Sequence, residues 1–116
     1  MNNSGRFEIE VNSSAKSIDM IIAGTYTPEK VKEFLAEYAL QVNSIPSNEY
    51  TLRINCLDID VLTQSMIPYM ECCFRFYQET GCKSMILIIN KSPMLKMQFN
   101  RIIKKTGFVN AAILEV

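Results

Sequence analysis

The sequence of 116 residues contains no histidine, and its twelve lysine and arginine residues balance twelve aspartate and glutamate residues. Without histidine, a general base would have to be Asp, Glu, Lys or Cys, and a metal site loses its commonest nitrogen ligand. A net charge of zero argues against a nucleic-acid-binding face and against polybasic attachment to a membrane. We therefore expect neither a nucleic-acid nor a membrane partner.

Long hydrophobic runs are also lacking. The longest apolar stretches, such as Met85 to Ile89, are far shorter than the roughly 20 residues that cross a bilayer. The first residues, Met1 to Gly5, have neither the basic nor the apolar region of a secretory signal. These observations predict a cytoplasmic protein.

Cysteine is present but poorly spaced for metal binding. Two of the four cysteines are adjacent, and no CxxC pair occurs. We expect no metal site and, in a cytoplasmic chain with an apolar core, no disulfide framework. The cysteines are interpreted as small buried hydrophobic residues. They are Cys56, Cys72, Cys73 and Cys82.

The apolar pattern predicts an α/β domain with the element order β-β-α-β-α-β-α-β. Residues 7–11 alternate apolar and charged residues, and Ile18, Met20 and Ile22 continue this period after a short polar turn, with Ile21 apolar on the other face; two such strands predict an antiparallel hairpin. Helices then alternate with strands, which favours parallel pairing and right-handed crossovers in a mixed sheet. The later strands are expected at 50–55, 85–89 and 111–114. Residues 1–6 are predicted to be a disordered lead-in to a single domain at 7–116.

The first and the third predicted helix each have a clear start signal. Thr27-Pro28 and Ser92-Pro93 each combine a capping hydroxyl with a proline at the first helical position. The unbroken apolar run Met85–Ile89 lies between helical segments, which predicts a central strand that is buried on both faces.

The second helix, ending near Thr80, has an ambiguous start. Ser65 is the favoured N-cap because it places Pro68 in the first turn, where an N–H is not needed; Asp60 or Thr63 with a kinked start is the alternative. One apolar stripe is ample for core contact: it comprises Met66, Tyr69, Cys73, Phe76 and Tyr77.

A second apolar stripe on the same helix comprises Ile67, Met70 and Phe74. The two stripes together are wider than the face that a surface helix usually buries. We therefore predict an exposed apolar patch at these residues, a feature typical of a protein-binding surface. The alternative is that the second stripe packs on a neighbouring helix.

The segment order resembles the STAS domains, the family that contains the bacterial anti-sigma-factor antagonists. The likeness covers nearly the whole chain and is clearest from Tyr50 onward. The residues that carry it are Leu52-Arg53-Ile54, Glu79-Thr80-Gly81-Cys82-Lys83, Met85 to Ile89, Ser92-Pro93 and Thr106-Gly107-Phe108.

The family carries an Asp-Ser-Ser-Gly segment at the start of the second helix, where a partner kinase phosphorylates a serine. That string is absent here, and the corresponding segment runs from Asp58 to Ser65. The resemblance makes Thr63 and Ser65 the phosphorylation candidates, with a plain helix cap as the alternative role of Ser65. Asp58 and Asp60 are interpreted either as part of the binding loop or as solvated carboxylates.

The resemblance implies a non-catalytic regulatory module that binds a protein partner, such as an anti-sigma-factor kinase-like ATPase, through the 57–65 loop and the second helix. The predicted contact residues are Asp58, Asp60, Ile67, Met70 and Phe74. One alternative is a homo-oligomer, such as a dimer formed through the strand at 7–11 or the second helix. Another is an enzyme that uses Asp58 and Asp60. No cofactor is expected.

Overall fold

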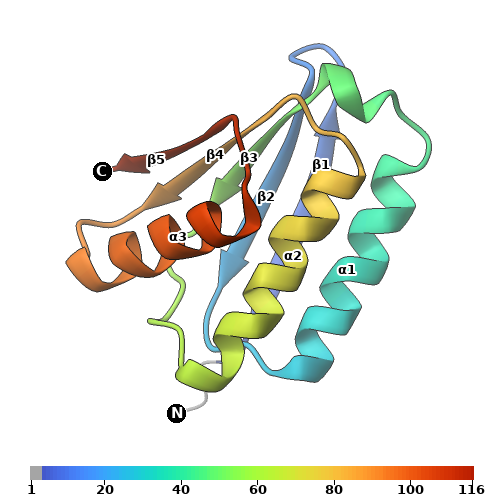
Figure 1. Ribbon diagram of the computed structural model, residues 1–116. Coiled ribbons are helices and arrows are strands. Elements are labelled where there is room, and N and C mark those ends of the chain that lie inside the picture. Colours follow the sequence, from blue (N-terminus) through green and yellow to red (C-terminus); the bar gives the residue numbers. More distant parts are fainter. Residues whose placement is uncertain (1–3) are drawn as a thin grey trace.

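The computed structural model describes residues 4–116 and has a mixed five-stranded sheet whose spatial order is β1-β2-β3-β4-β5. The three long helices all lie on one face of this sheet (Figure 1). The α/β class and the predicted element order are confirmed. The strands are β1 (Arg6–Asn12), β2 (Ser17–Ala23), β3 (Thr51–Asn55), β4 (Ser84–Ile89) and β5 (Ala111–Glu115). The helices are α1 (Pro28–Val42), α2 (Ile67–Glu79) and α3 (Pro93–Thr106), with short 3₁₀ turns η1 (Ser47–Glu49) and η2 (Gln64–Met66).

The N-terminal hairpin is antiparallel, as predicted, and the other strands pair in parallel. The predicted disordered segment extends too far, because regular structure starts before Phe7: Ser4 forms a β-bridge with Thr25, and Arg6 is the first residue of β1. The Tyr26 hydroxyl also donates to the Arg6 carbonyl at 2.6 Å. The rest of the predicted disordered lead-in, residues 1–3, lies outside the described residues.

The predicted helix starts of α1 and α3 are confirmed. The Thr27 hydroxyl oxygen accepts the N–H of Lys30 at 3.2 Å, and the Ser92 hydroxyl oxygen accepts the N–H of Leu95 at 3.3 Å. Gly107 ends α3 with φ of 71°, a left-handed conformation that glycine adopts without steric cost. None of the helices among residues 4–116 has the length and apolar character to span a membrane.

The prediction that residues 85–89 are buried on both faces is wrong. Met85, Leu87 and Ile89 are buried under the helices, whereas Ile86 and Ile88 on the other face are only half-buried. All three crossovers run to the same side because successive parallel strands are added in one direction across the sheet. One sheet face is therefore left without a helix.

Aromatic side chains fill the space between the sheet and the helices. Phe34 and Tyr38 of α1 contact Tyr77 of α2, with ring centroids 6.4 and 5.2 Å apart respectively. Phe74 of α2 stacks on Phe99 of α3 at 6.3 Å. The aromatic rings thus join all three helices into one core.

The four cysteines do not share one environment. Cys56 and Cys73 are buried, as predicted, and desolvation raises the pKa of each thiol to about 12. Cys82 is half-buried. The prediction is wrong for Cys72, which is exposed because it lies on the outer side of α2.

Candidate functional site

The 57–65 loop leaves the carboxyl end of β3 and runs alongside the end of β2. The Gly24 N–H donates to the Asp58 carbonyl at 2.9 Å, and the Asp60 N–H donates to the Gly24 carbonyl at 3.2 Å. Gly24 and Ile59 form a parallel bridge. The backbone of the first half of the loop is therefore hydrogen-bonded to the end of β2, as an extension of the sheet.

Side chains from α3 and from the end of β4 hold the rest of the loop. The Gln98 amide bonds to both backbone groups of Leu62: its nitrogen donates to the carbonyl at 2.9 Å, and its oxygen accepts the N–H at 3.1 Å. The Asn90 amide donates to the Leu57 carbonyl. Ile59 and Leu62 bury their side chains in the core. The loop is thus fixed on three sides.

The remaining side chains of the loop lie at the surface. Asp58, Val61 and Gln64 are exposed, and Val61 leaves 50% of its area in solvent. Asp60 is half-buried and accepts a hydrogen bond from the Thr25 hydroxyl, so the two predicted acids differ in environment. The fixed backbone therefore presents a mixture of acidic, amide and aliphatic groups in one orientation.

The predicted helix cap at Ser65 is wrong. Ser65 lies inside η2, where the Met66 N–H donates to the Thr63 carbonyl at 3.0 Å, and α2 starts at Ile67 without a side-chain cap. Pro68 sits in the first turn of α2, where the absent N–H costs nothing. The hydroxyls of Thr63 and Ser65 are exposed and lie 3.2 Å apart.

The predicted apolar patch of Ile67, Met70 and Phe74 is also wrong. Phe74 is 1% exposed, Met70 is 6% exposed, and Ile67 is half-buried. The cause is that α2 lies between α1 and α3 and packs against both, so both apolar stripes are used. The outward side of α2 instead carries Tyr69, exposed beside Pro68 and Cys72.

The hollow that the loop itself lines is small. A hollow of about 20 Å³ lies between the loop, the end of β2 and α2, with Tyr26, Leu62 and Met70 among its lining residues. A single water needs about 10–15 Å³, so this space is too small for an organic ligand.

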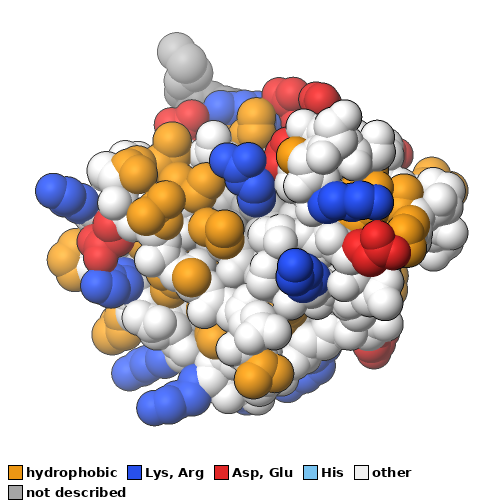
Figure 2. Space-filling view, turned by 90° about the horizontal axis from the view of Figure 1, so that it is seen from above, with side chains coloured by type: hydrophobic (Ala, Val, Ile, Leu, Met, Phe, Trp, Pro, Cys, Tyr) orange, Lys and Arg blue, Asp and Glu red, His pale blue; other side chains and the backbone are white. Residues whose placement is uncertain are grey.

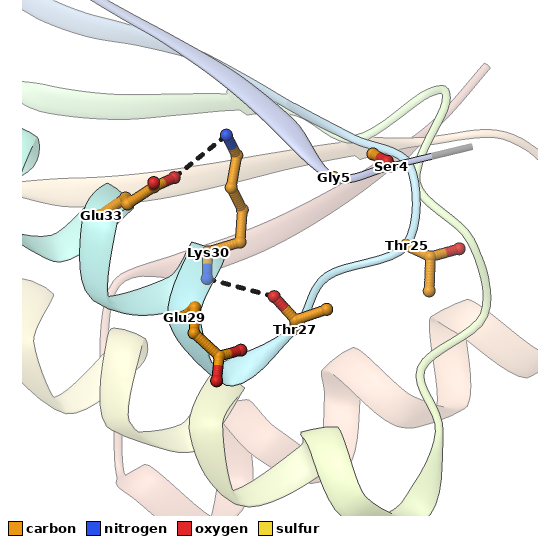
Figure 3. Close-up of a pocket in the computed structure, with 7 residues that line it drawn as sticks. All are labelled: Ser4, Gly5, Thr25, Thr27, Glu29, Lys30 and Glu33. Atoms are coloured by element: carbon orange, nitrogen blue, oxygen red, sulfur yellow. Dashed lines mark hydrogen bonds and ion pairs between the residues drawn. The ribbon is translucent and has the colours of Figure 1, made fainter. Parts of the chain in front are cut away.

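A wider hollow of about 600 Å³ opens beside the first turn of α1 (Figure 3). Two interactions link the residues that line it: the Lys30 ammonium lies 3.1 Å from the Glu33 carboxylate, and the Lys30 N–H donates to the Thr27 hydroxyl oxygen at 3.2 Å. The described residues that line it include no histidine or cysteine, and no hydrogen bond joins one of their hydroxyls to one of their carboxylates. Across residues 4–116, no cluster of three or more Cys, Asp or Glu has metal-binding geometry.

Sequence reasoning missed Gln98 and Asn90, the two side chains that hold the loop. Both lie more than 30 residues away from the groups they bind, with separations of 36 and 33 positions. An amide on a helix surface carries no local signal of such a role, because only the packing of α3 against the loop creates it.

Comparison with known proteins gives no relative for this chain: no family model, no curated protein and no solved structure matches it.

Proposed function

We propose that this protein is a non-catalytic, cytoplasmic regulatory module of the STAS type, and that it binds a protein partner through the exposed part of the 57–65 loop and the outward side of the first turns of α2. The observation that carries the proposal is the fixed loop. Its backbone is bonded to β2, to Asn90 and to Gln98, while Asp58, Val61 and Gln64 project into solvent. A pre-ordered loop binds without the entropy loss that ordering a flexible segment would require.

The corrected surface differs from the predicted one. Met70 and Phe74 belong to the core, so we assign the apolar part of the contact to Val61 and Tyr69, with the half-buried Ile67 beside them. Tyrosine is enriched in protein–protein interfaces, and the fully buried centre of an interface is more apolar than its rim.

Thr63 and Ser65 are the proposed sites of regulation. Both hydroxyls are exposed, and neither caps the backbone of α2, so a phosphate on either would not break a helix cap. A phosphate there would add up to two negative charges beside Asp58 and Asp60, which would repel a partner surface suited to the unmodified loop. An anti-sigma-factor kinase-like ATPase is the proposed partner.

The test is affinity capture from the native cell extract, with the wild-type protein and two variants as bait. Val61→Asp places a charge in the proposed contact. Leu40→Asp is the matched control, because Leu40 is 71% exposed near the C-terminal end of α1, at the opposite end of the sheet from the loop. We expect the wild type and Leu40→Asp to retain one ATPase that Val61→Asp loses.

Equal capture of that ATPase by Val61→Asp would contradict the assigned surface. Incubation of the recovered ATPase with ATP and the wild-type protein should add the mass of one phosphate. Thr63→Val and Ser65→Ala then identify the hydroxyl that is modified. Phosphate on a residue outside the loop would contradict the proposed regulation.

A further inference from the structure

β5 forms one edge of the sheet, and half of its backbone groups point away from β4. The Asn110 carbonyl accepts the N–H of Met85 at 2.8 Å, and the Val116 N–H donates to the Ile89 carbonyl at 3.1 Å. Backbone groups alternate in direction along a strand, so the even-numbered residues bond to β4 and the odd-numbered ones face outward. The outward residues are Ala111, Ile113 and Glu115. No strand lies beside them within residues 4–116.

The two edges of the sheet are protected to different degrees. At the β1 edge, Glu8 and Glu10 place charges among the apolar residues, which is a common device against unwanted strand pairing. β5 has no charged residue before Glu115, no proline and no glycine. A smooth aliphatic edge of this kind is a template for an added strand.

A groove on α3 borders the same edge. A hollow of about 720 Å³ follows the outer side of the helix, with the apolar side chains of Met97 and Ile103 among its lining residues. Three cationic side chains also line it: Lys96, Arg101 and Lys104. The Lys96 ammonium lies 2.7 Å from the Glu115 carboxylate of β5, so the groove and the strand edge form one continuous surface.

The charge of α3 indicates what this surface binds. The helix carries four basic residues, the three that line the groove and Lys105, and no acidic residue. In the described part of the chain, ion pairs engage Lys96 and Lys105. On the left of Figure 2, where Figure 1 places α3, β4 and β5, hydrophobic and basic side chains lie side by side. An acidic segment complements this surface.

A second copy of this chain fits less well. Two-fold pairing of β5 with its equivalent would place the two α3 helices next to each other, because both would flank the joined strands on the same side of the sheet. Each helix would then present Arg101 and Lys104, which no ion pair engages within residues 4–116, to the other. Like charges in such proximity oppose association.

We propose that the β5 edge and the α3 groove together bind an extended segment of another protein, which pairs with β5 as a sixth strand. Side chains of that segment alternate between the two faces of the sheet. Carboxylates on the helix side would meet Arg101 and Lys104. Aliphatic side chains on the open side would extend the apolar strip of Ala112 and Leu114, both of which are exposed. This surface is separate from the 57–65 loop.

The test uses a short fluorescent peptide of alternating glutamate and valine, acetylated and amidated, with a lysine–valine peptide as the control. We expect the full chain to bind the acidic peptide in fluorescence anisotropy and not the basic one. The double variant Arg101→Glu/Lys104→Glu should weaken binding about tenfold, since two exposed charge pairs are reversed. The loop variant Val61→Asp should bind like the wild type, which separates this proposal from the previous one.

Strand pairing itself is tested on the peptide. N-methylation of alternate amides in one register removes the donors that would face β5, whereas N-methylation in the other register leaves them intact. We expect one register to abolish binding and the other to retain it. Equal binding of both N-methylated peptides, equal binding of the acidic and basic peptides, or no binding of either would overturn the proposal. Formation of a dimer that excludes the peptide in analytical ultracentrifugation would overturn it in favour of a second copy.

Discussion

Replacing Gln98 with alanine should release the 57–65 loop. The Gln98 side chain makes two hydrogen bonds to the Leu62 backbone, of 2.9 and 3.1 Å, and Leu62 is buried. A hydrogen bond within a protein contributes a net of about 1 kcal/mol, so the loss of both of these part-buried bonds should cost about 2 kcal/mol of unfolding free energy. For a chain of this length that corresponds to a fall in Tm of roughly 5–10 °C.

Two measurements would check this expectation. Urea unfolding followed by circular dichroism gives the change in free energy, and hydrogen–deuterium exchange of the segment 57–65 reports the opening of the loop. Gln41→Ala is the matched control: its amide bonds to Glu37 one turn earlier on α1, at 2.9 Å, and such pairs contribute only about 0.2–0.5 kcal/mol. If both variants lose the same small free energy and exchange the loop amides equally, the amide of Gln98 does not hold the loop.

The remaining expectations concern the core. Tyr77→Phe should leave the free energy of unfolding in urea unchanged or raise it by about 1 kcal/mol, because no partner for the buried Tyr77 hydroxyl is found among residues 4–116. Tyr38→Phe should lower it by about 1 kcal/mol, because the Tyr38 hydroxyl makes two hydrogen bonds. A loss of stability in both variants would contradict this reasoning. Phe74→Ala should cost about 3–5 kcal/mol in the same assay, and a cost under about 1 kcal/mol would refute its core position. Stability should fall as pH rises above about 8.5, where the thiols of Cys56 and Cys73 ionise in the unfolded chain while burial holds their folded pKa at about 12. Unfolding curves from pH 8 to 10.5 should show a shallower fall in the Cys56→Ala/Cys73→Ala variant, and an unchanged slope would exclude the thiols as the cause.

The fold was predictable where the signals are local. The period-two alternation of residues 7–11 and the cap-plus-proline pairs at Thr27 and Ser92 report on backbone geometry within a few residues, and the structure has them as expected. The start of α2 is not predictable in the same way, because Asp60, Thr63 and Ser65 could each cap a helix. A 3₁₀ turn at residues 64–66 precedes α2, and this turn, for which the sequence gives no signal, shifts the first residue of the helix to Ile67.

The candidate site was less predictable because burial is a property of neighbours. The sequence shows how wide the apolar arc on α2 is, but not what covers it: Phe74 stacks on Phe99 of α3, a residue 25 positions later in the sequence. The apolar run Met85–Ile89 likewise does not reveal on which side the helices lie. Only the common direction of the three crossovers determines that Ile88 stays half in solvent.

The order of the strands across the sheet equals their order along the chain. During synthesis, each emerging strand therefore finds its partner already in place, and no strand has to be inserted between two that have paired before it. We expect the hairpin of β1 and β2 to form first, since it is the most local pairing. The sheet then gains one helix and one strand at a time, and β5 is added last. If the ribosome pauses before β5 emerges, β4 is the edge strand of the nascent sheet, and the backbone of its aliphatic residues Met85 to Ile89 is left unpaired on that side.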